Sequence, residues 1–181
     1  MRLLFIVLLS SASLFSTAQG LNYSPARQLV RLDIGMTIFS DIDKVGGYAG
    51  ATYEYSFMNH FGADVHLNTA LHHPSTYVGD HASRWGAGIN LIGRLYGLKS
   101  PYDVKFTAGA RYGSHFFTEL EEQGGQIIAV DGERRGGFYP ILGAGYEQRL
   151  GDWLLTLEFN VAFESNVQTF TSLAIGTGYR F

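Results

Sequence analysis

A two-residue alternation of apolar and polar side chains runs through most of this chain after Arg27 and constrains its fold more than any other feature. Successive side chains of a β-strand point to opposite faces of a sheet, so the alternation predicts strands with one apolar and one polar face. No stretch carries the 3.6-residue apolar period of a helix, and we therefore expect an all-β protein. Clusters of turn-forming residues divide the pattern into eight expected strands. These are residues 28–40, 46–57, 61–72, 84–96, 102–117, 138–150, 153–164 and 169–181.

The charged residues inside these stretches share one face of each strand. Assigning a register to each of the eight stretches uses one charged residue apiece and leaves six further charges as tests. All six agree with the register of their stretch, which has a chance of about 1 in 64 for a period of two. The fourteen charges comprise seven basic and seven acidic residues, a balance that suits a buried network because an unpaired buried charge is costly.

Two kinds of closed barrel have strands of this kind. A soluble, lipocalin-like barrel buries its apolar face, whereas a membrane barrel turns that face to lipid and fills its lumen with polar side chains. A water-exposed face is usually rich in lysine, but only Lys105 of the three lysines lies in a stretch. Glycine recurs on the polar face, and glycine fits a narrow lumen. We therefore expect an eight-stranded antiparallel up-and-down transmembrane β-barrel.

The polar face is then expected to form a lumen plugged by charged side chains, because eight strands leave room only for side chains. The predicted lumen charge network comprises Arg31, Asp33, Glu54, Asp64, Arg84, Arg94, Asp103, Lys105, Arg111, Glu147, Arg149, Glu158 and Glu164.

The connections alternate between short and long, as expected of periplasmic turns and external loops. The short ones are residues 58–60, 97–101 and 151–152, and the long ones are 41–45, 73–83, 118–137 and 165–168. Aromatic residues near the strand ends predict two girdles at the membrane interfaces. The inner girdle would hold Tyr55, Phe57, Phe61, Tyr102, Tyr146, Trp153 and Tyr179, and the outer one Phe116, Phe138 and Phe163.

The first eighteen residues are typical of a secretory signal. Arg2 precedes the apolar run Leu3–Leu9, and Ser16-Thr17-Ala18 offers small residues for cleavage. Seven consecutive apolar residues are too few to span a membrane. We therefore expect a signal peptide at 1–18 and a barrel domain at 19–181.

The C-terminal third carries recognisable sequence. Residues 143–153, GAGYEQRLGDW, followed by 155–159, LTLEF, resemble the penultimate hairpin of small outer-membrane barrels of the OmpA/OmpX type. The ending at 173–181, LAIGTGYRF, resembles their last strand, and this implies an assembly signal at Tyr179 and Phe181 for the barrel assembly machinery. The resemblance further implies the outer membrane of a Gram-negative bacterium, in contact with its lipid and lipopolysaccharide. We expect a monomer.

Composition excludes several classes of function. The chain has no cysteine, which rules out disulfides, thiolate metal sites and a Cys nucleophile. A pI of about 6.0 without basic clusters argues against nucleic acid. His72, His73 and His81 with Asp80 lack a defined ligand spacing, so we expect no metal and no cofactor.

Three functions remain, of which a structural or surface-interaction role is favoured. The longest connection, 118–137, is interpreted either as a hairpin that extends its flanking strands or as a protruding edge for a partner, and 73–83 offers a second partner surface. The first alternative is a lipid A-modifying acyl hydrolase or acyltransferase, because such enzymes use this scaffold. Ser114-His115 face opposite sides, however, and His73-Pro74-Ser75 is interrupted by proline. The second alternative is a narrow channel for small apolar molecules.

Overall fold

The computed structural model describes residues 27–39, 44–72, 81–123, 126–130, 134–164 and 168–181. The strands in this part of the chain are β1 (Gln28–Phe39), β2 (Lys44–Tyr55), β3 (Phe61–His72), β4 (His81–Arg94), β5 (Tyr102–Gln123), β6 (Gln126–Val130), β7 (Arg134–Leu150), β8 (Trp153–Glu164) and β9 (Gln168–Arg180). Within these ranges, no helix has the length and apolar character needed to cross a membrane.

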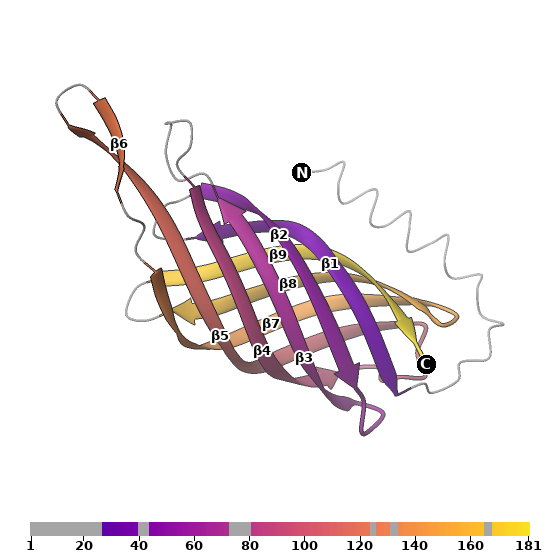
Figure 1. Ribbon diagram of the computed structural model, residues 1–181. Coiled ribbons are helices and arrows are strands. Elements are labelled where there is room, and N and C mark those ends of the chain that lie inside the picture. Colours follow the sequence, from indigo (N-terminus) through magenta and orange to yellow (C-terminus); the bar gives the residue numbers. More distant parts are fainter. Residues whose placement is uncertain (1–26, 40–43, 73–80, 124–125, 131–133, 165–167) are drawn as a thin grey trace, which may run out of the picture.

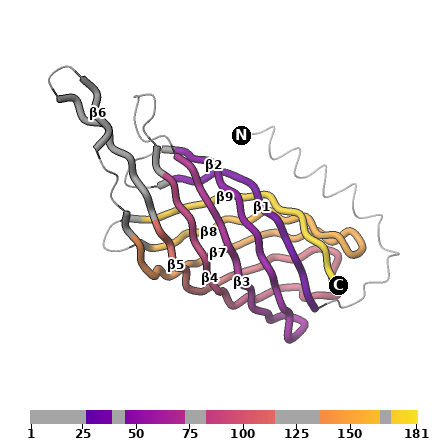
Figure 2. Tube along the Cα trace, in the orientation of Figure 1, coloured from indigo at the N-terminus to yellow at the C-terminus, as the bar shows by residue number. Residues whose placement is uncertain are grey.

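Eight of the strands close into an antiparallel barrel (Figure 1). The order is β4–β3–β2–β1–β9–β8–β7–β5, and the pairing of β4 with β5 completes the ring. The first and last strands pair from Leu29↔Arg180 to Phe39↔Phe170, so β1 and β9 lie side by side along the tube in Figure 2. The predicted all-β barrel of eight antiparallel strands is confirmed.

The connection expected at 118–137 consists largely of paired strand. The end of β5 pairs with β6 from Glu119↔Val130 to Gln123↔Gln126, and this hairpin projects beyond the other strands in Figure 1. The interpretation as a hairpin extension is therefore confirmed. The strand expected to end at 117 continues to Gln123, and the strand expected to begin at 138 begins at Arg134. Backbone pairing needs no buried apolar face, so it continues past the point where the alternation stops.

Other strand ends shift by two or three residues. The stretch expected at 84–96 forms β4 from His81 to Arg94, because Leu95 and Tyr96 enter the turn. There the backbone N–H of Tyr96 donates to Asp103 Oδ1 at 3.0 Å. The stretch expected at 46–57 forms β2 from Lys44 to Tyr55.

The faces of the barrel are inverted relative to a water-soluble one. Strand β3 alternates throughout, with Val65 and Leu67 exposed and Asp64 and His66 buried. Across the barrel, large apolar side chains cover the outside, up to 80% exposure at Phe138. Charged side chains occupy the inside, since every strand charge whose side chain is described is at most 8% exposed.

Short turns gather at one end of the barrel, here named the turn end, and the opposite end is named the loop end. The turn end also holds the beginning of β1 and the end of β9 (Figure 2). Gly97 and Gly151 in these turns have φ of 78° and 67°, in the left-handed region that favours glycine. Gly97 also lies so close to Asn59 that a Cβ would meet its amide nitrogen at 2.4 Å.

Candidate functional site: the barrel interior

Ten charged side chains form one connected set of ion pairs inside the barrel, here named the ion network. Seven of the eight barrel strands contribute to it, β3 being the exception, and it contains five acidic and five basic residues. Its members are Arg31, Asp33, Glu54, Arg94, Asp103, Lys105, Glu147, Arg149, Glu158 and Arg180.

Glu147 on β7 is the centre of the ion network. It is fully buried, and its carboxylate lies within 3.6 Å of nitrogens of four cations on four strands. The shortest of these contacts joins Oε2 to a terminal nitrogen of Arg149 at 3.2 Å. The other three partners are Arg94, Lys105 and Arg180. Because these cations come from several strands, the Glu147 carboxylate links those strands from inside the barrel.

A second node joins β1 to β8. Arg31 contacts both carboxylate oxygens of Glu158, one of them at 2.7 Å, and its Nε lies 2.9 Å from Asp33. Lys105 contacts the same Glu158 carboxylate. Paired, bidentate geometry of this kind is the strong form of a charged hydrogen bond, and it offsets much of the cost of burying these charges.

Arg149 links the ion network to the turn end. Its guanidinium donates to the carbonyl oxygen of Gly97 at 2.8 Å and also to that of Ser100. Leu98 in this turn is only 4% exposed, and its N–H donates to the Asn59 side chain at 3.1 Å. The turn at residues 97–100 is therefore fastened to the interior and to the neighbouring turn.

A separate group of polar side chains lies away from the ion network and is here named the Arg111 cluster, comprising Asp64, His66, Asn90 and Arg111. Arg111 Nε donates to His66 Nε2 at 3.1 Å, and Asn90 donates to Asp64 Oδ1 at 2.9 Å. His66 Nδ1 lies 3.4 Å from the same carboxylate oxygen. Because Nε2 accepts from Arg111, the proton of a neutral His66 resides on Nδ1 and points to Asp64.

The interior also holds apolar side chains that the alternation did not predict. Phe170, Ala70, Ile141 and Ala162 pack together on the inward face, each nearly or fully buried. The guanidinium carbon of Arg84 lies 3.8 Å from the centre of the Phe170 ring, and that of Arg111 lies 5.9 Å away. These cation–π contacts place an apolar and aromatic layer inside the barrel beside the charged one.

The structure places most of the predicted network residues inside but does not join them all. Asp64, Arg84 and Arg111 lie inside yet outside the ion network, whereas Arg180 belongs to it although it was not in the predicted set. The side chain of Glu164 lies outside the described residues. Strand parity indicates which residues face inward, but the partner of each depends on how the strands are staggered around the ring.

Most of the residues considered for chemistry lie, with their side chains, outside the part of the chain that the structure describes. Ser114 on β5 pairs with the outward-facing Trp85 and is only 4% exposed, while the side chain of His115 lies outside the described residues. The segment His73-Pro74-Ser75 and Asp80 also fall outside them. Among the residues that the structure describes, no group of three or more His, Asp or Glu side chains could hold a metal ion.

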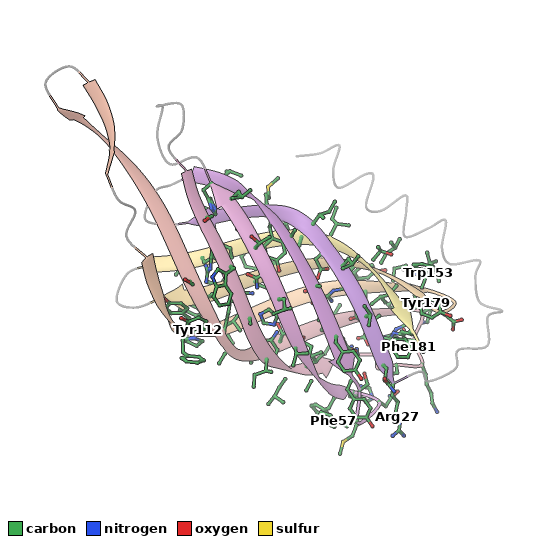
Figure 3. The ribbon with its side chains drawn as sticks, in the orientation of Figure 1. Arg27, Phe57, Tyr112, Trp153, Tyr179 and Phe181 are labelled. Carbon is green, nitrogen blue, oxygen red and sulfur yellow. The ribbon has the colours of Figure 1, made fainter. Side chains whose placement is uncertain are left out.

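Aromatic side chains mark both ends of the outer wall (Figure 3). At the turn end, Trp153 packs edge-on against Tyr179 with Phe181 near them, and Phe57 lies at the same end of the barrel. Toward the loop end, Tyr112 packs against Trp85 and Phe138, with ring centres 5.6 and 5.2 Å apart. Trp85 and Tyr112 were not among the residues expected in the outer girdle. The side chain of Phe116, which was, lies outside the described residues.

Comparison with known proteins identifies structural relatives. No protein-family model matches the chain, and no curated protein sequence matches it. Neisserial surface protein A superposes with a TM-score of 0.63 at 11% identity, covering 87% of this chain and 98% of that one. Ail, the attachment invasion locus protein of Yersinia pestis, gives 0.61 at 15% identity, covering 86% and 99%. The N-terminal β-barrel domain of Pseudomonas aeruginosa OprF gives 0.55 at 10% identity, covering 84% and 97%.

These likenesses extend over nearly the whole length of each relative, and they agree with the closed ring of eight antiparallel strands. At such low sequence identities, these structural likenesses establish the architecture of the chain alone. The chain has the fold of the small eight-stranded outer-membrane β-barrels.

Proposed function

We propose that this protein is an integral protein of the outer membrane of a Gram-negative bacterium, with a structural or surface-interaction role. The observation that carries the proposal is the inverted barrel, with charges inside and a continuous apolar surface outside. Water cannot accommodate so many exposed large apolar side chains in one band, whereas lipid solvates them at no cost. The aromatic residues at both ends of the wall suit the two membrane interfaces.

Membrane insertion is tested by fractionation and by gel mobility. The protein is expected in the outer-membrane fraction, and it should migrate differently in detergent gels before and after boiling, because a closed barrel resists detergent until heated. Cleavage after Ala18 is expected to be visible in the mass of the purified protein. Recovery in a soluble fraction, with a single gel mobility, would contradict the proposal.

The lumen is proposed to be plugged by side chains rather than open as a channel. The ion network crosses the interior from wall to wall, and the cavity between it and the Arg111 cluster measures about 20 Å³. Such a space holds one or two water molecules, since about 10–15 Å³ suffices for one. In planar bilayers we expect no large, steady channels. Stable openings of constant size would instead support the alternative of a narrow conduit.

A structural role is favoured over an enzymatic one. A lipid A hydrolase or acyltransferase needs a nucleophile and a base on one strand face. Ser114, itself 4% exposed, shares the strand face of Tyr112 and pairs with the outward-facing Trp85, whereas His66 faces the interior. Mass spectrometry of lipid A from cells with and without the gene is expected to show the same acyl pattern. A changed pattern would restore the enzyme hypothesis.

The β5–β6 hairpin is proposed as the surface that meets a partner, because it projects beyond the barrel with one strand edge free of barrel pairing. A related fold, Ail, has been crystallised with the heparin analogue sucrose octasulfate. In this chain the segment is acidic in sequence, with Glu119, Glu121, Glu122, Asp131 and Glu133 against two arginines. We therefore propose contact with lipopolysaccharide phosphates bridged by divalent cations rather than direct capture of a polyanion.

This contact is tested with a variant in which residues 119–133 are replaced by a short Gly-Asn-Gly turn. The full barrel is expected to bind lipopolysaccharide more tightly with Ca²⁺ than with a chelator, and the shortened barrel should lose this difference. A matched variant with the five acids changed to Gln or Asn separates charge from shape. Insertion through the barrel assembly machinery is proposed to use Tyr179 and Phe181, and the barrel is proposed to be monomeric.

A further inference from the structure

A small chamber lies inside the barrel between the ion network and the Arg111 cluster, and it is here named the lumen chamber. Its volume is about 20 Å³, and every barrel strand except β9 contributes a residue to its lining. All of these residues are polar or charged apart from Ile141. Because about 10–15 Å³ suffices for one water molecule, the chamber has room for one small ion or for one or two water molecules.

Arg111 lines the lumen chamber and carries a charge that has no direct counter-ion in the described part of the chain. Its side chain is 2% exposed, and its Nε donates to the neutral His66 ring at 3.1 Å. Among the described residues, its Nη1 has no hydrogen-bond partner. A buried charge without a partner is costly, and an anion at Nη1 would offset much of that cost.

The two carboxylates that line the lumen chamber are held by other groups. Asp64 accepts a hydrogen bond from Asn90 at 2.9 Å, and the His66 ring stands between Asp64 and Arg111. Glu158 is held through both of its oxygens by Arg31. Neither carboxylate forms an ion pair with Arg111 in the described part of the chain, so the demand for a counter-ion remains at its Nη1.

Further donors surround the same small space. The hydroxyls of Tyr48 and Thr107 and the amide of Asn160 line the lumen chamber, and each carries a hydrogen that it can direct inward. Gly50 leaves room for the Tyr48 hydroxyl, because a Cβ at that glycine would lie 2.9 Å from the hydroxyl oxygen. A guanidinium together with hydroxyl and amide donors is the set of groups that binds an anion.

We propose that the lumen chamber binds one small inorganic anion of the size of chloride, against Nη1 of Arg111. The small volume of the chamber excludes polyatomic anions such as sulfate and phosphate. The bound ion takes the place that a carboxylate takes in the ion network, so the solvent supplies one component of the plug. This inference goes beyond the proposed surface role and concerns the interior alone.

The test compares salts that differ only in their anion. The natural chain is refolded into phosphatidylcholine vesicles and unfolded with urea in sodium chloride, sodium gluconate or sodium sulfate at equal ionic strength. A ligand that binds the folded state alone stabilises it by mass action. A site with a dissociation constant of about 50 mM would raise the folding equilibrium constant about ten-fold in about 0.5 M chloride. Gluconate and sulfate should give equal, lower stabilities.

Two variants locate the effect. Arg111→Met should abolish the difference between chloride and gluconate, and Asn160→Asp should abolish it as well by placing a carboxylate at the chamber with little change of shape. Arg180→Met is the matched control, because this arginine is also buried, its Nε has no hydrogen-bond partner among the described residues, and it does not line the chamber. The control should keep the full difference between the two salts, whatever stability it loses in both.

A water-filled chamber predicts that no variant and no salt changes the result, and this outcome would overturn the inference. An equal effect of sulfate and chloride, or an unchanged chloride effect in Arg111→Met, would overturn it too. If Arg111→Met does not fold, the natural chain and Asn160→Asp are crystallised in sodium bromide. An anomalous bromide peak beside Arg111 in the natural chain that is lost in Asn160→Asp supports the site, and no peak in the natural chain overturns it.

Discussion

The guanidinium of Arg31 on β1 holds the carboxylate of Glu158 on β8 with both of its terminal nitrogens, across the intervening strand β9. Strand β9 makes this possible because it carries Ala174 opposite Glu158 and Gly176 opposite Asp33. The pair thus spans the seam where the first and last parts of the chain meet. Its energetic role follows from its burial, since Arg31 is 3% and Glu158 8% exposed.

Removing one member of this pair is expected to be costly. Arg31→Met leaves the Glu158 carboxylate short of its bidentate partner and should lower the free energy of unfolding by about 3–5 kcal/mol. Urea unfolding of the refolded barrel in lipid vesicles measures this. Lys99→Met, at an exposed turn position, is the control and should change stability by less than about 0.5 kcal/mol.

The double variant Arg31→Met with Glu158→Met separates pairing from burial. Because both charges are then absent, the loss is expected to be smaller than the sum of the two single losses, by about 1–3 kcal/mol of coupling. Additive losses would show that the two side chains act independently.

The strand seam between β1 and β9 is expected to be sensitive to a single methyl group at Gly35. A Cβ at this position would lie 2.1 Å from the backbone oxygen of Leu173 and 2.6 Å from the Cα of Ala174, and neither can move without shifting β9. Gly35→Ala should therefore lower the urea midpoint or prevent folding. Gly93→Ala is the matched control, because nothing lies within 4 Å of its Cβ position, and it should fold normally.

Arg149→Ala is expected to loosen the turn end. The change removes the donors to the carbonyls of Gly97 and Ser100 and one partner of Glu147. In planar bilayers the variant should show brief, small openings that the natural chain lacks. Arg27→Ala, an exposed arginine at the same end, should behave like the natural chain. Identical silent traces for all three would contradict a role for this turn in closing the lumen.

Phe181 is expected to matter for assembly more than for stability. Its side chain is 56% exposed, so Phe181→Ala removes little packing. Refolding into vesicles should be nearly unchanged, whereas the amount inserted in the outer membrane of cells should fall several-fold. Ile175→Ala, which removes a similarly exposed apolar side chain from the same face of β9, is the control for lost apolar area. Equal insertion by the natural chain and Phe181→Ala would contradict an assembly signal.

The sequence alone predicts well which side chains of each strand face the inside of the barrel. A charge such as Arg94 or Glu147 cannot face lipid without a large cost, so its position marks the inward face of the whole strand. Apolar residues carry no such mark, because Phe170 and Ile141 are acceptable on either side. Parity with Glu147 and Arg180 places both on the inward face, but that they pack together there becomes visible only in the closed barrel.

Contacts between residues that are far apart in the chain could not be predicted from the sequence, and the reason is geometric. The stagger of the strands around the ring decides that Glu147 meets Arg94 and Arg180, and that stagger is a property of the closed barrel.

The ion network has a consequence for how the chain must reach its final state. Its ten members come from seven strands, so a sheet that has not yet closed between β1 and β9 presents half-matched charges along its inner face. Unpaired charges on that face would be costly to remove from water. We therefore expect closure of the last seam to coincide with the expulsion of water from the lumen.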